Sequence, residues 1–354
     1  MSLSLQPLHS KDQLNEILAR PELRDYATFF QSWEWGEFQA SRGRTIHRFS
    51  INDDDVIVGS ILFIEDIDRF GTVLYAPRGP VLDWRNISIA EATLSLLVIE
   101  GKKLAPKAIC LRLDPAIVHD APEVAAFPAS GFKAAAKFTQ VERAWMASLQ
   151  PSQDEQITWQ KEHGMRSNIP RYLRRAEREG VTVRVGESAE DLEVFLTMIT
   201  GLNERKNGIG LHPLDYYRKQ FAALAPSGYE RIFICEKDGE PLAAAMITIY
   251  GHEASYLWGA STDKQRDLRG PHFMHFQIMR YAYEHGCSQY NFWGVVKEEN
   301  HNPSYRGYGF SEFKRSFGGY VELYQRTQDY VYRALPYRLA FINDQRRLRS
   351  SQMD

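Results

Sequence analysis

The sequence predicts an α/β protein built from two similar domains. A chain of 354 residues is longer than a single hydrophobic core usually grows. The same order of strands and helices can be read in each half of the chain. The tripeptide Arg-Gly-Pro also occurs at corresponding places, at 78–80 and 269–271. Together these observations indicate that one structural unit occurs twice, and they argue against two unrelated domains.

The first half predicts four strands and one long helix. Apolar residues that alternate or run continuously predict the strands, and apolar residues at helical spacing predict the helix. In order, the expected elements are strand 45–51, turn 52–55, strand 56–64, strand 72–76, loop 77–85, a helix from about 87 to 104 and strand 108–113.

The second half repeats this order. Its expected elements are strand 231–236, turn 237–240, strand 242–250, strand 254–259, a loop, helix 271–285 and strand 289–293. This is the order of the GNAT acyltransferase core, in which the loop before the central helix presents backbone N–H groups to an anionic ligand. The sequence thus predicts two GNAT-like domains, each a mixed, mostly antiparallel sheet with flanking helices, although a fold does not fix a function.

A polar segment over 151–180 separates the halves. A helix is expected from about residue 154, with an interruption at Pro170, because proline is not tolerated inside a helix. We place the domain boundary here, after residue 152. Further helices are expected at 188–203 and 215–224, the first with a core-facing apolar stripe.

Composition excludes several classes of protein. Hydrophobic residues make up 44% and charged residues 25%, as in ordinary globular chains, so disorder is not expected. No apolar run approaches the roughly 20 residues that cross a bilayer, and the first residues do not resemble a secretion signal, so we expect a cytoplasmic protein. Cys110, Cys235 and Cys287 lie far apart in apolar surroundings and are expected to be buried. The ten histidines show no metal-binding pattern, so no metal site is expected.

Charge is unevenly distributed. The formal net charge of -2 argues against a protein that coats nucleic acid indiscriminately, and we expect no DNA partner. Six basic residues nevertheless lie within 161–178, and Arg346, Arg347 and Arg349 lie near the end of the chain. The first cluster has the charge to follow a tRNA backbone, and a solvated amphipathic helix is the alternative explanation.

Short motifs along most of the chain point to a family. They are Gln31-Ser32 with Trp35, the segments 75–80, 111–115 and 171–181, Asn203-Glu204-Arg205, Gly259-Ala260-Ser261, Phe292-Trp293-Gly294, Gly309-Phe310, Phe313-Lys314 and Phe317-Gly318-Gly319. In this order and spacing the chain resembles the FemABX aminoacyltransferases, especially the compact FemX-like members without a long coiled-coil arm.

The resemblance implies an organisation and a reaction. The C-terminal segment 320–354 would return to the first domain, 1–152, and leave 153–319 as the second. The enzyme would move an amino acid from aminoacyl-tRNA to the side-chain amine of a peptidoglycan stem peptide, on a UDP-MurNAc-peptide or on lipid II. Neither coenzyme A nor a metal would be needed. A peripheral enzyme of this kind could contact the inner face of the membrane.

The reaction needs particular groups. Aminolysis of an ester requires a neutral amine, stabilisation of the oxyanion and stabilisation of the departing ribose oxygen. It needs no covalent intermediate, so the absence of a Ser-His-Asp or Cys-His pattern is expected. Lys314 is at the position where the family has a lysine that stabilises developing negative charge. Asp114 follows a buried strand and could accept a proton from the attacking amine, or it could be a turn aspartate that binds nearby backbone N–H groups.

Substrate contacts are expected from residues matched to the family. Arg205 resembles an arginine that binds the precursor phosphate, a task suited to a guanidinium. The family tends to have a lysine for that phosphate where this chain has Gln39, and Arg42 or Arg44 are the candidates to compensate. Other expected substrate-binding residues are Arg78, Tyr216, Tyr256 and Phe313. The expected tRNA-binding residues are Arg171, Arg174 and Arg175.

Two other functions remain open. One is an acyl-CoA-dependent GNAT N-acyltransferase, but the candidate phosphate loop, 267–272, has a proline inside it and a histidine at its last position, which makes a poor pyrophosphate cradle. The other is a tRNA-binding or envelope protein whose transferase site has decayed. Lys314, Asp114 and Arg205 disfavour it, whereas Gln39 keeps it open.

Overall fold

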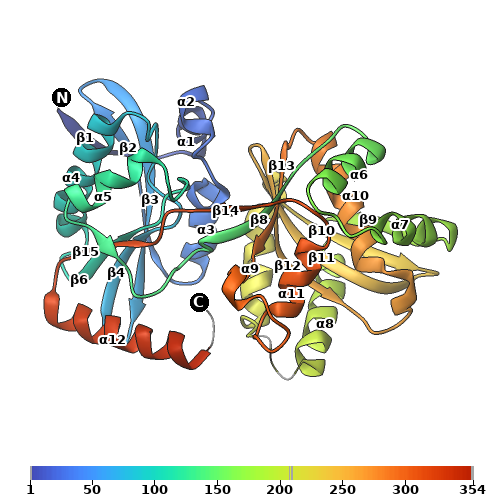
Figure 1. The fold of residues 1–354 in the computed structure, drawn as a ribbon. Coiled ribbons are helices and arrows are strands. Elements are labelled where there is room, and N and C mark those ends of the chain that lie inside the picture. The colour runs from blue at the N-terminus through green and yellow to red at the C-terminus, as the bar shows by residue number, and fades with distance from the viewer. Residues whose placement is uncertain (1, 207, 209, 352–354) are drawn as a thin grey trace. The chain divides into compact units, whose positions relative to one another are not determined.

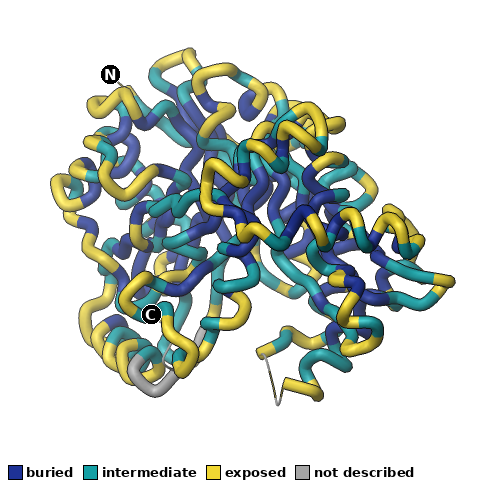
Figure 2. The backbone as a smooth tube through the Cα atoms, turned by 45° about the vertical axis from the view of Figure 1, so that its right-hand side comes forward, coloured by how far each residue is buried: buried dark blue, intermediate teal, exposed yellow. Residues whose placement is uncertain are grey.

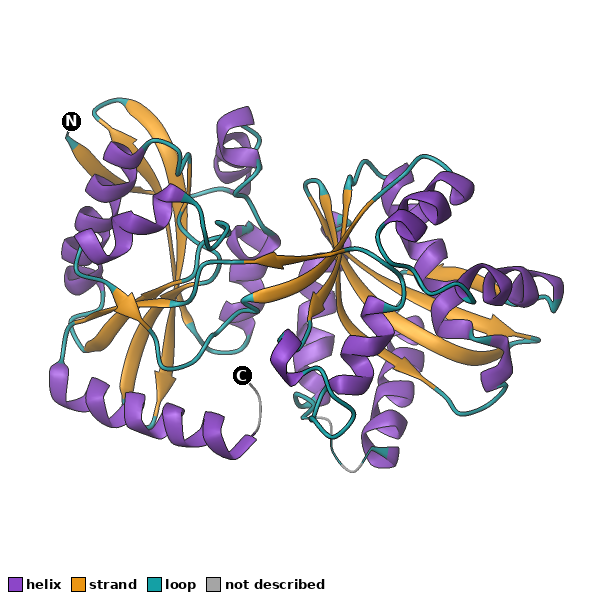
Figure 3. Cartoon of the chain, in the orientation of Figure 1, coloured by secondary structure: helices purple, strands orange, loops and turns teal. Residues whose placement is uncertain are grey.

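The computed structural model describes residues 2–206, 208 and 210–351, and its chain divides into two compact units (Figure 1). Unit 1 comprises residues 1–142 and 323–354, and unit 2 comprises residues 143–322. Each unit contains one sheet with helices packed against it (Figure 3). The chain therefore has the two GNAT-like α/β domains that the sequence predicts.

Unit 1 begins with elements in residues 1–44 that were not predicted from the sequence. Its helices and strands are β1 (Leu3–Pro7), α1 (Lys11–Leu18), α2 (Pro21–Arg24), α3 (Trp33–Ser41), β2 (Thr45–Asp53), β3 (Val56–Asp68), β4 (Gly71–Ala76), β5 (Val81–Leu82), α4 (Ile87–Leu104), β6 (Ala108–Leu113), α5 (Ala126–Ala129), β7 (Lys133–Ala134), β15 (Gln328–Val331) and α12 (Ala334–Ser351).

Unit 2 is continuous in sequence. Its helices and strands are β8 (Arg143–Ser148), α6 (Gln153–Glu162), α7 (Ile169–Arg178), β9 (Thr182–Gly186), α8 (Ala189–Arg205), α9 (Leu214–Leu224), β10 (Glu230–Lys237), β11 (Glu240–Tyr250), β12 (Glu253–Ser261), α10 (Gly270–Glu284), β13 (Gln289–Gly294), α11 (Tyr308–Arg315) and β14 (Tyr320–Leu323). Short 3-10 helices at Phe29–Gln31, Pro122–Ala125, Ala225–Ser227, Arg266–Leu268 and Glu298–Asn300 complete the two units.

The two sheets have the same topology. The strand order in unit 1 is β1-β2-β3-β4-β6-β15-β7, with the short β5 paired to β3 off this path, and in unit 2 it is β9-β10-β11-β12-β13-β8-β14. In each sheet one neighbouring pair is parallel, β4 with β6 and β12 with β13, and in each case a long helix connects the two strands. Parallel neighbours need such a crossover, whereas antiparallel neighbours need only a turn. The duplication inferred from the sequence is therefore present in the strand pairing.

The last strands are exchanged between the halves of the sequence. β8 follows the first half of the chain but pairs with β13 of unit 2, and β15 follows the second half but pairs with β6 of unit 1. The boundary predicted after residue 152 is therefore wrong by ten residues. The predicted boundary lies in a polar segment, whereas the chain changes from one sheet to the other before β8. The position of the boundary depends on strand pairing, which the composition of the segment does not indicate.

Both faces of each sheet are covered. In unit 1, Leu94 and Leu97 of α4 pack with Leu111 on one face, while Tyr337 of α12 packs with Ile109 on the other. In unit 2, α10 and α8 cover opposite faces, because successive residues of β11 join different core clusters. The tube in Figure 2 is accordingly darkest along the strands and lightest at turns and outer helix faces.

The polar segment forms two helices. α6 ends at Glu162, a loop follows, and α7 begins at Ile169 with Pro170 in its first turn. A proline is tolerated there because the first N–H groups of a helix have no partner within the helix. The predicted interruption therefore lies before Pro170, and the proline is in the first turn of the second helix. The three cysteines are buried, as expected.

Candidate active site

Lys314 is buried in unit 2. It lies in α11, is 8% exposed, and donates a hydrogen bond of 2.7 Å from Nζ to the carbonyl oxygen of Gly294. Burial lowers the pKa of its ammonium group to about 7. The polar sequence around Lys314 suggests a solvated surface lysine, but the structure places it in a desolvated position, where the charge acts strongly on a reacting group.

A bulge in β13 presents the partner of Lys314. Two residues of β13, Phe292 and Trp293, oppose one residue of β8, and Trp293 has a positive φ of 70°. Such a bulge interrupts the ladder and redirects the backbone. Gly294 follows immediately after the bulge, and its carbonyl oxygen accepts the hydrogen bond from Lys314. The motif Phe292-Trp293-Gly294 thus places a carbonyl group for Lys314.

Aromatic rings surround this lysine. Its Nζ lies 5.2 Å from the ring centre of Phe310 and 5.9 Å from that of Tyr256. Burial raises the pKa of the Tyr256 hydroxyl to about 12. The half-buried Phe313 packs its ring against Phe317, at 5.2 Å between ring centres. The structure therefore brings together three predicted site residues, Lys314, Tyr256 and Phe313.

Two histidines of α10 join this cluster, and sequence reasoning missed them. His275 is fully buried, and its Nδ1 lies 2.8 Å from the hydroxyl oxygen of Tyr290. Burial lowers the pKa of His275 well below its usual value, and burial with the charge of Arg269 lowers that of His272 to about 4. The signal available in the sequence was their spacing of three residues, which places both on one helix face. That spacing matches no metal-binding pattern.

The backbone after α11 is tightly packed. Gly318 has a φ of 78°, and a Cβ atom there would lie 2.4 Å from the carbonyl oxygen of Gln160. The Gly318 carbonyl oxygen accepts a hydrogen bond of 3.1 Å from Trp145 Nε1. Only glycine adopts this backbone conformation readily and also leaves room for the Gln160 carbonyl oxygen. The motif Phe317-Gly318-Gly319 therefore fixes where α11 ends.

Arg205 and Tyr216 lie on other parts of unit 2. Arg205 ends α8, is exposed, pairs with Asp263 at 3.1 Å and donates to the carbonyl oxygen of Ser261. Tyr216 stacks on His212 at 4.0 Å and lies edge-on to Trp258. Residues two apart in a regular strand share a face, but a bulge between β11 and β12 places Tyr256 and Trp258 in different core clusters. Tyr216 is thus grouped with Trp258, whereas Tyr256 is grouped with Lys314.

The predicted tRNA-binding arginines lie on α7. Leu173 and Ala176 of this helix are buried, while Arg171 and Arg174 are exposed. Arg175 is half-buried and forms an ion pair with Asp267. α7 is therefore amphipathic. This agrees both with tRNA binding and with a solvated helix, the two interpretations made from the sequence.

Asp114 is the centre of a second cluster, in unit 1. It is 1% exposed, and its carboxylate accepts hydrogen bonds from the Arg78 backbone N–H at 2.8 Å and from the Tyr75 hydroxyl at 2.9 Å. Burial raises its pKa to about 6, although the charge and the N–H of Arg78 lower it. The alternative of a local turn aspartate is wrong, since the N–H that Asp114 binds lies 36 residues away.

Arg78 has an internal position. Its φ is 52°, its guanidinium donates to the Val141 carbonyl oxygen at 2.6 Å, and it covers the ring of Tyr324 at 4.4 Å. The side chain is buried, so these contacts give it a structural role; the predicted contact with substrate stays a prediction. Gln31 holds the same loop by donating to the Pro77 carbonyl oxygen at 2.7 Å, and a Cβ on Gly79 would overlap the Gln31 side chain.

Gln39 is buried at the end of α3 and binds two arginines. Its Oε1 accepts hydrogen bonds from Arg42 at 3.0 Å and from Arg44 at 2.9 Å. Arg44 also pairs with Asp66 at 2.6 Å. The structure thus gathers the two candidate substitutes for the missing lysine around Gln39 itself.

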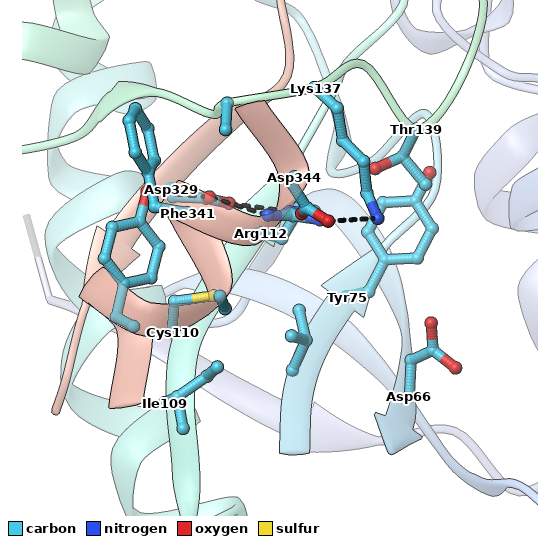
Figure 4. A pocket seen from close by; sticks show the side chains of 14 residues that line it. Asp66, Tyr75, Ile109, Cys110, Arg112, Lys137, Thr139, Asp329, Phe341 and Asp344 are labelled. Carbon is cyan, nitrogen blue, oxygen red and sulfur yellow. Dashed lines mark hydrogen bonds and ion pairs between the residues drawn. The ribbon is translucent and has the colours of Figure 1, made fainter. Parts of the chain in front are cut away.

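A pocket of about 170 Å³ lies between the sheet of unit 1 and α12 (Figure 4). Arg112 and Asp329 form a bidentate ion pair in it at 2.7 and 2.8 Å, and Tyr337 donates to the same carboxylate at 3.0 Å. Tyr75 lines the pocket and also donates to Asp114. Arg112 of β6 therefore lines this pocket, with Asp329 of β15 as its partner.

Comparison with known proteins identifies the family. The FemAB family model matches residues 22–226, more than half of the chain. The chain belongs to the FemAB family. A second model, described as an acetyltransferase (GNAT) domain, matches residues 163–315 within unit 2. This match agrees with the strand order described above.

Individual relatives extend the comparison. The chain is 23% identical to a lipid II:glycine glycyltransferase of Staphylococcus saprophyticus, and the alignment covers 95% of each chain. It is 24% identical to a UDP-N-acetylmuramoylpentapeptide-lysine N(6)-alanyltransferase of Weissella viridescens, over 72% of this chain and 76% of the relative. The crystal structure of FemX has the same fold, with a TM-score of 0.82, 19% identity, and coverage of 96% of this chain and 99% of FemX.

The described residues contain neither a metal-binding cluster nor a membrane-spanning helix. Within 2–206, 208 and 210–351, no group of three or more His, Cys, Asp or Glu side chains is arranged to hold a metal ion. Over the same described part of the chain, no helix combines the length and the apolar character that a membrane span requires.

Proposed function

We propose that this protein is an aminoacyltransferase that moves an amino acid from aminoacyl-tRNA to the stem-peptide amine of a peptidoglycan precursor. The observation that carries the proposal is the buried Lys314, with a pKa of about 7, in a chain of the FemAB family. Its relatives named above are glycyl- and alanyltransferases whose names include lipid II and a UDP-linked muropeptide. Perturbed pKa values in such clusters are typical of functional sites.

The reaction follows from ester aminolysis. The amine nitrogen attacks the ester carbonyl carbon, the bond from that carbon to the ribose oxygen breaks, and the amine loses a proton while the ribose oxygen gains one. The Lys314 ammonium stabilises the negative charge that develops on the ester oxygens, a contribution of roughly 3 kcal/mol for one such donor. Asp114, with a pKa of about 6, accepts the proton from the amine.

Other residues bind the two substrates. Arg42 and Arg44, fixed by Gln39 in unit 1, are one candidate group for the precursor phosphate, and Arg205 in unit 2 is a separate candidate. Tyr216, Tyr256 and Phe313 provide hydrogen-bonding and apolar surfaces for the substrates. The exposed arginines of α7, Arg171 and Arg174, follow the phosphates of tRNA.

The test measures transfer directly. A tRNA pool charged with one radiolabelled amino acid at a time is incubated with UDP-linked or lipid-linked muropeptide of each stem-peptide type. The native protein is compared with Lys314→Met and with Lys103→Met, which removes an exposed lysine of α4. We expect label on an acceptor with the native protein and with Lys103→Met, and a loss of roughly a hundredfold or more in kcat with Lys314→Met.

The outcome decides between the functions. Absence of label from both acceptor types would overturn the proposal. A parallel reaction with radiolabelled acetyl-CoA tests the GNAT alternative, which the match of unit 2 to a GNAT domain model favours. Against that alternative, Pro271 lies in the first turn of α10 and removes one of the N–H groups that would bind a pyrophosphate.

A further inference from the structure

Helix α12 is apolar on two opposite faces. On the inner face, Tyr337, Ala340 and Phe341 pack against the sheet of unit 1. On the outer face, Leu335 is 73% exposed, Leu339 53% and Ile342 36%. These three residues follow each other at intervals of four and three, so they form one stripe along the helix. Packing within unit 1 explains the inner face and leaves the outer one without an explanation.

The hairpin between β3 and β4 lies beside this helix, because Arg69 donates a hydrogen bond to the side chain of Asn343 in α12. Ile67 in the hairpin is also exposed, but it follows Asp66, which lines the pocket under α12, and so lies on the other face of the sheet. Scattered single exposed apolar residues are ordinary on protein surfaces, whereas three that follow one another along one helix face indicate a binding surface. We name Leu335, Leu339 and Ile342 the α12 patch.

Positive charge borders the α12 patch. Arg338 and Arg346 are exposed on the same side of the helix as the stripe, because they lie three residues after Leu335 and four after Ile342. The sequence of α12 has a single carboxylate, Asp344, which lies toward the inner face, where it lines the pocket and pairs with Lys137 at 3.1 Å. The outer face therefore combines apolar side chains with arginines.

We propose that the α12 patch docks unit 1 on the surface of an anionic lipid bilayer. Helices that lie in a membrane interface have this character, with apolar side chains inserted at the boundary between headgroups and acyl chains and basic residues that meet lipid phosphates. Leu335, Leu339 and Ile342 enter the bilayer surface, and Arg338 and Arg346 bind the headgroups.

Charge argues against a second copy of this chain as the occupant. In a symmetric dimer through the α12 patch, each copy would present the same arginines to the other. Arg338 and Arg346 would then face like charges across an apolar contact, which is unfavourable. A bilayer that contains anionic lipid complements both the apolar stripe and the arginines. The inference stands on the α12 patch alone and does not depend on the proposed transfer reaction.

The experiment measures partition of the full-length protein onto vesicles. Phosphatidylcholine vesicles with and without phosphatidylglycerol are floated on a density gradient, and bound protein is quantified. We compare the native protein with the triple variant Leu335→Gln, Leu339→Gln, Ile342→Gln and the double variant Arg338→Gln, Arg346→Gln. The control is Ile99→Gln with Val118→Gln, which changes exposed apolar residues elsewhere in unit 1.

The expected result is specific. The native protein and the control bind vesicles that contain phosphatidylglycerol, salt weakens the binding, and each α12 variant lowers the partition by about tenfold or more. The proposal is overturned if the native protein does not bind these vesicles at low salt, or if the α12 variants bind as the native protein does. It is also overturned if sedimentation shows self-association that the triple variant abolishes. Transfer to the soluble UDP-linked acceptor, measured in the same variants, keeps this outcome separate from the proposed reaction.

Discussion

Lys314 and Asp114 are the two residues at which burial changes the chemistry most directly. Each is held by hydrogen bonds to groups distant in sequence, the Gly294 carbonyl in one case and the Arg78 N–H with the Tyr75 hydroxyl in the other. Burial moves both pKa values toward neutrality, downward for the lysine and upward for the aspartate. Both groups therefore change charge within the range in which the enzyme would work.

A bell-shaped pH profile is expected from this pair. Asp114 must be ionised to accept a proton, so kcat/KM rises as the pH increases through about 6. Lys314 must be protonated to stabilise negative charge, so kcat/KM falls as the pH increases through about 7. Initial rates of transfer between pH 5 and pH 9 measure both limbs, in roughly one-unit steps. Lys314→Arg should remove the alkaline limb, because arginine stays charged over this range; an unchanged alkaline limb would contradict the assignment.

Gln39 offers a second test at this scale. Gln39→Leu removes the oxygen that binds Arg42 and Arg44, and we expect the KM for the precursor to rise by about tenfold with kcat nearly unchanged, the effect of losing ground-state binding. Gln13→Leu, at an exposed position of α1, is the matched control. If Gln39→Leu lowers kcat and leaves KM unchanged, the two arginines do not bind the ground-state precursor. Circular dichroism checks that the variant folds.

At the scale of elements, the repeated core was predictable and the exchanged strands were not. The helix at 87–104 and the strand at 108–113 were predicted with the bounds that the structure has, because each has a regular apolar pattern. β15 has no such pattern, since it contains Gln328 and Asp329, and its place depends on an ion pair between Asp329 and Arg112, 217 residues away. Sequence periodicity carries no information about such a distant partner.

The same contrast holds for the candidate site. Family motifs indicated Lys314, but the polar sequence around it gave no sign of burial. His275 was missed because a single histidine on an apolar helix face does not stand out, and only the tertiary contact with Tyr290 gives it a place in the cluster. The grouping of Tyr256 with Lys314 depends on a bulge in β12, and no residue in the sequence predicts this bulge.

Helix α7 provides the prediction that belongs to this scale. Arg171→Gln combined with Arg174→Gln should weaken binding of charged tRNA and lower the slope of log affinity against log salt by roughly 1 to 2, because two phosphate contacts are lost. Filter binding over a salt series measures the slope. Arg218→Gln combined with Lys219→Gln on α9 removes the same charge elsewhere in unit 2. Equal effects of the two double variants would favour the solvated-helix interpretation.

For the whole molecule, one buried carboxyl group links stability to pH. Glu230 is fully buried, and burial raises its pKa to about 8, although its hydrogen bond from Gln220 lowers it. Between the unfolded pKa and about 8, the folded protein holds a proton that the unfolded chain has released. Stability therefore falls as the pH rises through this window, by at most roughly 1.4 kcal/mol per pH unit.

Glu230→Gln should remove this dependence. The difference in the free energy of unfolding between the variant and the native protein should increase in favour of the variant from about pH 5 to about pH 8. Urea unfolding at several pH values measures the difference, and comparing variants cancels the opposite contribution of Lys314. Glu16→Gln, at an exposed position, should show no such trend. A constant difference across this range would mean that Glu230 is ionised in the folded protein.

The exchanged strands set the order in which the protein can finish folding during synthesis. Unit 2 is a continuous stretch, so its sheet can close once residue 322 has left the ribosome. Unit 1 must wait, because β15 lies between β6 and β7 and is made near the end of the chain. The part of the protein that is begun first is thus completed last. A chain that stops at residue 322 should contain a protease-resistant unit 2 and a protease-sensitive unit 1, and resistance of residues 1–142 in that chain would contradict this order.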